Sequence, residues 1–277
     1  MCRHLAYVGP PVALRELVID PPHSLYRQSW APRRQKYGTV NADGFGLGWY
    51  AEGDPLPARY RRAGPIWDDP SFADVCRVTR SGALLGAVRD ITEGSVADES
   101  AAAPYTADRW LFSHNGALRG WPHSVAEAAR TLPPEELLTL EARCDSALAW
   151  ALTLHRLRAG APADEALADT VGRLAALTPD SRLNFLLTDG LAIAGTAWGD
   201  TLWYLDTPGR SLVVASEPYD DRPRWTEVPD RHLLYGDPTE VLLIPLKEPH
   251  LCARSPSPAP CPPTPPRPRC APTWPTG

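Results

Sequence analysis

Residues 2–8 read CRHLAYV, an apolar and β-rich stretch that predicts a strand at the very start of the chain. Only Arg3 and His4 interrupt its apolar character. The Gly-Pro-Pro triplet at 9–11 is expected to end the strand, because proline lacks the backbone N–H that a ladder needs. The fold is therefore expected to begin with a strand that starts at residue 2.

Outward from this strand, the predicted elements come as strands, then helices, then strands again. Residues 41–50 alternate glycines with aromatics, which indicates a turn that feeds a strand. Residues 110–113 are a short apolar strand, and 114–116 are expected to form the turn after it, since Asn-Gly is a strong hairpin signal. This order, with its antiparallel hairpin signals, favours an α+β layered sandwich over a parallel doubly wound sheet. The other expected strands are 59–61, 83–88, 183–188, 191–197, 201–205, 211–215 and 241–245. The expected helices are 12–19, 71–80, 124–131, 134–158 (with a break near 144–146) and 163–177. Residues 23–40 and 89–109 are expected to be loops.

Length and charge narrow the class of protein. The 277 residues are enough for one large domain, or two small ones, with a sizeable core. A formal net charge of −5 lacks the basic excess that neutralises phosphates, so no nucleic-acid partner is expected. There is no signal-peptide pattern, and no stretch approaches the roughly 18 apolar residues of a membrane span. We therefore expect a cytoplasmic protein.

The composition changes sharply near residue 248. Proline, serine and arginine dominate the rest of the chain, and such a segment cannot bury a core. We therefore expect one folded domain over 2–247 and a disordered, proline-rich tail over 248–277.

The six cysteines include no Cys-x-x-Cys pair, so no structural metal site is expected. A cytosolic chain with its own core does not need disulfides.

Cys2 directly follows the initiator methionine. A small residue in this position usually permits removal of Met1, which would give Cys2 a free α-amine beside its thiol. An α-amine has a pKa of about 7.7–8.0, so it can take a proton from a nucleophile near neutral pH without another base. N-terminal nucleophile (Ntn) hydrolases use this arrangement. The residue type alone is weak evidence of such chemistry, since many unrelated proteins have cysteine in this position.

Three further sites fit the cleavage of an amide by Cys2. Asn115 and Gly116 offer a side-chain amide and an unhindered backbone N–H for an oxyanion hole, although the same pair is a common hairpin turn. If the substrate is a γ-glutamyl amide, Arg89 fits its α-carboxylate, with Thr92 as a hydroxyl donor beside it. Asp145 fits the α-ammonium. Solvated surface charge is the alternative reading of Arg89 and Asp145.

Together these segments resemble the class II glutamine amidotransferases. The resemblance lies in Cys2, the 41–50 segment, VRDITEG at 88–94, SHNG at 113–116 and CDS at 144–146. Further stretches are similar to one branch, the stand-alone amidohydrolases of ergothioneine biosynthesis. These stretches are LAYVGPP at 5–11, PPHSL at 21–25, NFLLTDG at 184–190 and ASEPYD at 215–220, and the resemblance covers residues 2–247.

This resemblance implies a single-domain, four-layer αββα Ntn-hydrolase sandwich of antiparallel sheets. It implies Cys2 as the nucleophile, Asn115 and Gly116 as the oxyanion hole, and no metal or other cofactor. Substrate binding would fall to four residues, with Arg89 and Thr92 on the glutamyl α-carboxylate, Asp145 on the α-ammonium, and His114 beside them. The branch acts on γ-glutamyl-hercynylcysteine sulfoxide, a small molecule, and releases glutamate.

The chain departs from the family pattern in three places. It has Ala87 where histidine is usual, Asp90-Ile91 where the usual pair is small, and Ala147 where the wider class often has glutamate. Asp90 would place an extra carboxylate beside the glutamyl site. Two other functions stay open: a glutaminase subunit that supplies ammonia to a separate synthase, and a catalytically silent Ntn-fold binding module.

Overall fold

Alternating side chains of the first strand divide between two cores, and this division sets the architecture. A computed structural model describes residues 2–91, 94–96 and 98–247. Within β1 (Arg3–Ala13), Leu5 and Tyr7 pack against helices, whereas Ala6 and Val8 face a second sheet. A strand has a side-chain period of two, so one strand can serve both cores.

Two antiparallel sheets result. The first has seven strands in the order β11-β9-β10-β1-β4-β2-β3, and the second has six in the order β13-β12-β8-β7-β6-β5. The first comprises β1, β2 (Phe45–Tyr50), β3 (Pro57–Arg62), β4 (Arg80–Val88), β9 (Trp203–Thr207), β10 (Ser211–Ala215) and β11 (Thr226–Glu227). The second comprises β5 (Tyr105–Ala107), β6 (Trp110–Ala117), β7 (Arg182–Thr188), β8 (Ile193–Ala197), β12 (His232–Gly236) and β13 (Val241–Pro245).

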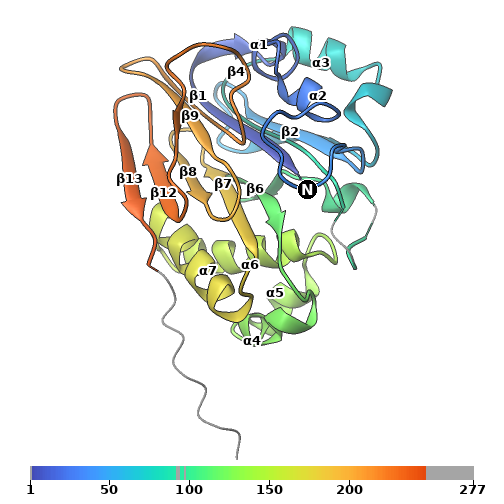
Figure 1. Ribbon diagram of the computed structural model, residues 1–277, viewed down its shortest axis with the longest axis vertical. Coiled ribbons are helices and arrows are strands. Elements are labelled where there is room, and N and C mark those ends of the chain that lie inside the picture. Colours follow the sequence, from blue (N-terminus) through green and yellow to red (C-terminus); the bar gives the residue numbers. More distant parts are fainter. Residues whose placement is uncertain (1, 92–93, 97, 248–277) are drawn as a thin grey trace, which may run out of the picture.

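Helices cover the outer face of each sheet, as Figure 1 shows. One hydrophobic cluster joins the first sheet to its helices, a second joins the other sheet to α6 and α7, and a third lies between the sheets. Three cores separate four layers, so the predicted αββα sandwich is confirmed. The helices are α1 (Arg15–Val18), α2 (Leu25–Gln28), α3 (Phe72–Val78), α4 (Ala126–Ala129), α5 (Pro134–Leu138), α6 (Asp145–Arg158) and α7 (Ala163–Leu177), with short 3-10 turns at Ile66–Asp68, Glu99–Ala101 and His123–Val125.

The predicted turn at 114–116 is wrong, because these residues lie inside β6. Asn115 pairs with Asn184 and Gly116 with Leu183 in the ladder to β7. The Asn-Gly preference for a turn is local, and pairing along a whole neighbouring strand outweighs it.

The first strand is longer than predicted. It continues beyond 9–11 to Ala13, with a register shift between Val8 and Val12, so the helix expected at 12–19 is only Arg15–Val18. A bulge absorbs the two prolines, which lets the ladder to β4 resume.

Other boundaries also changed. The break expected near 144–146 in the helix at 134–158 is confirmed, since α6 begins at Asp145, although α5 already ends at Leu138. The loop expected at 89–109 contains a 3-10 turn and β5. Strand β12 and helix α2 were not predicted. Thr92 and the tail at 248–277 lie outside the described residues. Among the helices of the described chain, none is long and apolar enough to cross a membrane.

The core between the sheets should carry much of the stability. Leu186, which lies in it, is 0% exposed, whereas Leu191 in the next turn is 74% exposed. We expect Leu186→Ala to lower the free energy of unfolding by about 2–5 kcal/mol through lost burial and a cavity. Leu191→Ala should change it by no more than about 0.5 kcal/mol. Urea unfolding measures both, and equal effects would contradict the layer assignment.

Candidate active site

The Cys2 side chain lies at the start of β1, beside the end of β4. Arg3 pairs with Val88 in the ladder, so Cys2 extends past the last residue of β4. Its half-buried thiol lies 3.9 Å from the backbone oxygen of Asp90. The carbonyl of Cys2 accepts a hydrogen bond of 2.8 Å from Nε of Arg3, which fixes the backbone that carries the thiol.

A small pocket lies beside this thiol. Its walls come from the end of β4, from β6 and from the first turn of α6, which are far apart in sequence. Four of the predicted site residues line it: Cys2, Arg89, His114 and Asp145. The cavity has a volume of about 20 Å³, which is room for about one water molecule.

Only one of the two terminal nitrogens of Arg89 has a hydrogen-bond partner among the described residues. It is 7% exposed, and its Nη2 donates to the backbone oxygen of Val96 at 2.9 Å. Its Nη1 is buried and has no hydrogen-bond partner among the described residues. A buried donor without an acceptor is costly, and the planar guanidinium matches a carboxylate. A carboxylate bound in this pocket would supply the missing acceptor.

Asp145 begins helix α6 and is 2% exposed. Its Oδ2 accepts from the backbone N–H of Leu118 at 3.0 Å, and its Oδ1 accepts from that of Ser146 at 2.8 Å. The carboxylate thus ties the helix start to the residue after β6, a position where the helix dipole favours negative charge. Each oxygen has a second lone pair, so the group can still accept from an ammonium.

His114 forms part of the pocket wall, and both of its ring nitrogens already have partners. Nε2 lies 2.9 Å from the backbone oxygen of Arg182, and Nδ1 lies 3.1 Å from Oγ of Ser146. Because a carbonyl can only accept, the network assigns the proton to Nε2. Burial lowers the pKa of His114, which favours the neutral ring. A substrate-binding role for His114 stays a prediction, and its nitrogens serve the fold.

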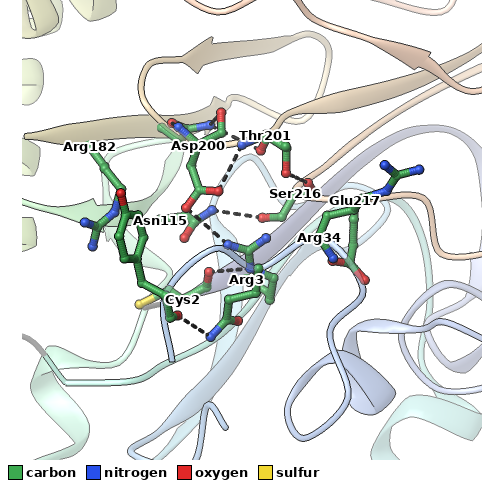
Figure 2. Close-up of polar contacts among 12 residues, drawn as sticks. Cys2, Arg3, Arg34, Asn115, Arg182, Asp200, Thr201, Ser216 and Glu217 are labelled. Carbon is green, nitrogen blue, oxygen red and sulfur yellow. Dashed lines mark hydrogen bonds and ion pairs between the residues drawn. The ribbon is translucent and has the colours of Figure 1, made fainter. Parts of the chain in front are cut away.

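Asn115 and Gly116 do not line this pocket. Asn115 points toward Ser216, and its Nδ2 donates to the serine Oγ at 3.3 Å (Figure 2). Its Oδ1 is buried without a hydrogen-bond partner among the described residues. At Gly116 a Cβ would lie 2.0 Å from the backbone oxygen of Arg182, so only glycine allows this approach of β7.

The departures from the family pattern fall in different places. Ala87 and Asp90 line the pocket, and a Cβ added at Gly38 would lie 3.0 Å from Oδ2 of Asp90, which places this carboxylate against the loop before β2. Ala147 is 1% exposed in the core beneath the second sheet, and it does not line the pocket.

A buried polar cluster beside the nucleophile was not predicted. It comprises Arg3, Asp200, Ser216 and Glu217, each no more than 4% exposed. Nη2 of Arg3 lies 3.3 Å from Oδ2 of Asp200 (Figure 2). The carboxylate of Glu217 accepts two successive backbone N–H groups from the loop before β2, at 2.9 and 2.7 Å. In the sequence, this cluster could have been suspected from Ser216 and Glu217, two polar residues that directly follow the apolar stretch 211–215.

Gly116 gives a test of this packing. We expect Gly116→Ala to destabilise the protein strongly, because the added methyl meets backbone oxygen that cannot yield without shifting β7. Gly172 lies within α7, and a Cβ there meets nothing within 4 Å. Gly172→Ala should therefore raise the free energy of unfolding by about 0.5–1 kcal/mol. Thermal unfolding compares them, and a Gly116→Ala variant as stable as wild type would contradict the geometry.

His4 gives a pH dependence. Its ring is 1% exposed, and burial lowers its pKa well below the usual value. A lowered folded-state pKa contributes stability that is present above the unfolded pKa of about 6.5 and is lost as the pH falls. Between pH 7.5 and 5.5 the free energy of unfolding should decline, by up to about 1.4 kcal/mol per pH unit for each such histidine. Chemical denaturation should show a shallower decline for His4→Asn, and an unchanged slope would exclude His4 as a source.

Known proteins share this architecture and much of this sequence. Residues 17–209 match the family described as glutamine amidotransferases class-II. A Mycolicibacterium smegmatis protein named gamma-glutamyl-hercynylcysteine sulfoxide hydrolase is 41% identical, over 89% of this chain and 100% of that protein. A protein of the same name from Mycobacterium tuberculosis is 43% identical, over 84% of this chain and 92% of that one.

Solved structures show the same fold at lower identity. A glutamine aminotransferase class-II domain protein from Silicibacter pomeroyi has a TM-score of 0.65 and 24% identity, covering 89% of this chain and 100% of that one. A glutamine phosphoribosylpyrophosphate amidotransferase from B. subtilis has a TM-score of 0.62 and 14% identity, covering 89% of this chain and 49% of that one. By its family match and its identity to relatives over most of their length, this chain belongs to the class II glutamine amidotransferases.

Proposed function

We propose that this chain is an Ntn amidohydrolase that cleaves the γ-glutamyl amide of γ-glutamyl-hercynylcysteine sulfoxide, releasing glutamate and hercynylcysteine sulfoxide. The observation that carries the proposal is the pocket that places the Cys2 thiol beside Arg89 and Asp145. One cation and one anion beside a nucleophile suit an amino acid presented by its side-chain amide. The names of the relatives at 41–43% identity support the substrate.

The proposed nucleophile is the thiol of Cys2 after removal of Met1. The free α-amine of Cys2 accepts the thiol proton, and Sγ attacks the γ-carbonyl carbon. The carbonyl oxygen becomes an oxyanion, for which Asn115 and the backbone N–H of Gly116 supply donors. The α-ammonium of Cys2 then protonates the leaving nitrogen as the C–N bond breaks, which leaves a γ-glutamyl thioester on Cys2.

Water completes the reaction by attacking the thioester carbonyl. The α-amine accepts a proton from this water, the C–S bond breaks, and glutamate and the Cys2 thiol are regenerated. During both steps the glutamyl group is held at its α-carbon. Arg89, with Thr92, binds the α-carboxylate, Asp145 binds the α-ammonium, and His114 completes the wall. These groups use no metal ion or other cofactor.

We further propose that residues 2–247 are the catalytic domain and that the protein works in the cytoplasm. The class II resemblance spans this range, and the composition changes at 248–277. Deleting 248–277 should leave glutamate release unchanged. A loss of activity in the truncated protein would show that the tail belongs to the catalytic unit.

Glutamate release measured by mass spectrometry tests the function. Rapid release from γ-glutamyl-hercynylcysteine sulfoxide but not from glutamine, abolished in Cys2→Ala, is expected. Release from glutamine instead would keep the cysteine chemistry but indicate a glutaminase that supplies ammonia. Release from neither compound would indicate a binding module.

Two experiments test the proposed mechanism. An electrophilic glutamine analogue should add to Cys2, as intact mass and peptide mapping would show, and an adduct elsewhere would exclude the thioester scheme.

Asn115→Ala should lower kcat by about 10²–10³-fold, because it removes one oxyanion donor. A kcat within about threefold of wild type would remove Asn115 from the oxyanion hole.

A further inference from the structure

Ser216 joins the two strands that carry the proposed reaction. Its Oγ accepts the backbone N–H of His4 at 3.0 Å and Nδ2 of Asn115 at 3.3 Å. His4 lies two residues after Cys2 on β1 of the first sheet, whereas Asn115 lies on β6 of the second. Figure 2 shows Ser216 and Asn115 linked in this way beside Arg3 and Cys2. One oxygen atom therefore contacts both strands across the space between the sheets.

The serine is itself held firmly. It follows β10, is 0% exposed, and donates its backbone N–H to the oxygen of His4 at 2.9 Å. Its own carbonyl accepts from Oγ1 of Thr201 at 2.8 Å. A side chain on a backbone fixed at both ends can hold its partner within the narrow tolerance that catalysis requires.

We propose that Ser216 is a positioning residue, whose hydroxyl fixes the Asn115 carboxamide relative to Cys2 so that an amide N–H meets the oxyanion. The inference rests on the proposed function, since it assigns Asn115 to the oxyanion hole. Ser216 does not line the pocket and touches no reacting atom in the proposed scheme. It acts through Asn115 alone.

The donors and acceptors of Ser216 and Asn115 favour one of the two orientations of the Asn115 carboxamide. A hydroxyl has one proton to donate, and Oδ1 of Asn115 is buried without a partner among the described residues. A half turn of the carboxamide exchanges Oδ1 and Nδ2 at nearly the same positions. Ser216 then donates to Oδ1, and both N–H bonds of Nδ2 are free for an oxyanion. In this form Oδ1 of Asn115 and the Ser216 hydroxyl satisfy one another, and Nδ2 of Asn115 is the donor of this pair that remains for an oxyanion, as an oxyanion hole requires.

The expected effect falls on turnover. Misplacing a catalytic group by about 1 Å can cost about 10²-fold in rate. We expect Ser216→Ala to lower kcat by about 10–100-fold while KM changes by less than about threefold, because the glutamyl pocket is untouched. Ser216→Cys, with a similar shape and a weaker donor, should fall between wild type and Ser216→Ala.

A double-mutant cycle is the decisive experiment. It compares wild type, Ser216→Ala, Asn115→Ala and the double variant in kcat for glutamate release from γ-glutamyl-hercynylcysteine sulfoxide and from glutamine. A parallel readout is the rate at which a diazoketone analogue of glutamine modifies Cys2. If Ser216 acts through Asn115, Ser216→Ala should cost little once Asn115 is alanine. Independent, multiplying effects would overturn the proposal, as would a Ser216→Ala variant with wild-type kcat.

A matched serine separates positioning from stability. Ser81 is 2% exposed, and its hydroxyl bonds to the backbone oxygens of Tyr50 and Ala83, outside the pocket beside Cys2. Ser81→Ala should lower stability but leave kcat unchanged, whereas Ser216→Ala lowers kcat. If Ser216→Ala fails to fold, the cycle is run with Ser216→Cys.

Wild-type rates distinguish failure of this inference from failure of the proposed function. Turnover of glutamine but not of the sulfoxide would contradict the proposed substrate, while the cycle on glutamine still decides the role of Ser216. A wild type that neither turns over substrate nor is modified at Cys2 would overturn both.

Discussion

Contact between the inner faces of the two sheets fixes where the proposed catalytic groups lie. Ala6 and Val8 of β1 share the inter-sheet core with Leu111 of β6. Sheets that pack face to face are about 10 Å apart, so short apolar side chains hold the strands at a set distance. Cys2 directly precedes β1, and Asn115 lies within β6. The same packing that excludes water from the core therefore sets the separation of nucleophile and oxyanion donor.

The fold was predictable where hydrophobic periodicity and strand pairing agree. Residues 5–8 alternate in the structure between two cores, and the apolar character of 2–8 marked that stretch as a strand. Residues 114–116 were misassigned because the turn preference of Asn-Gly is a local property, whereas their pairing with β7 depends on residues far away in sequence. Strand β12 was missed, and β1 was cut short at its prolines, for the same reason: tertiary pairing decided both.

The site was predictable only in part. Cys2, Arg89, His114 and Asp145 were found from their chemistry and from the family resemblance, and the structure brings them to one pocket. Their roles stay predictions. Ser216 lies in the ASEPYD stretch that resembles the branch, but no role followed from it, because a serine after an apolar strand fits a turn as well as a buried contact. Only the ladder that seats β10 beside β1 places its hydroxyl at Asn115.

Arg3 and Arg89 are both buried, but their charges are compensated differently. Arg3 is 0% exposed, and it donates to the carbonyl of Cys2 and pairs with Asp200, so its charge is compensated within the chain. Burial alone lowers its pKa, and the nearby carboxylate opposes that shift. Arg89 is nearly as buried, yet its Nη2 donates to a backbone oxygen, and no carboxylate of the described residues forms an ion pair with it. A buried charge without an opposite charge beside it lowers stability, and an anion that compensates it binds more strongly for that reason. Arg3 has its anionic partner within the fold, whereas among the described residues no carboxylate forms an ion pair with Arg89, as a site for an anionic ligand requires.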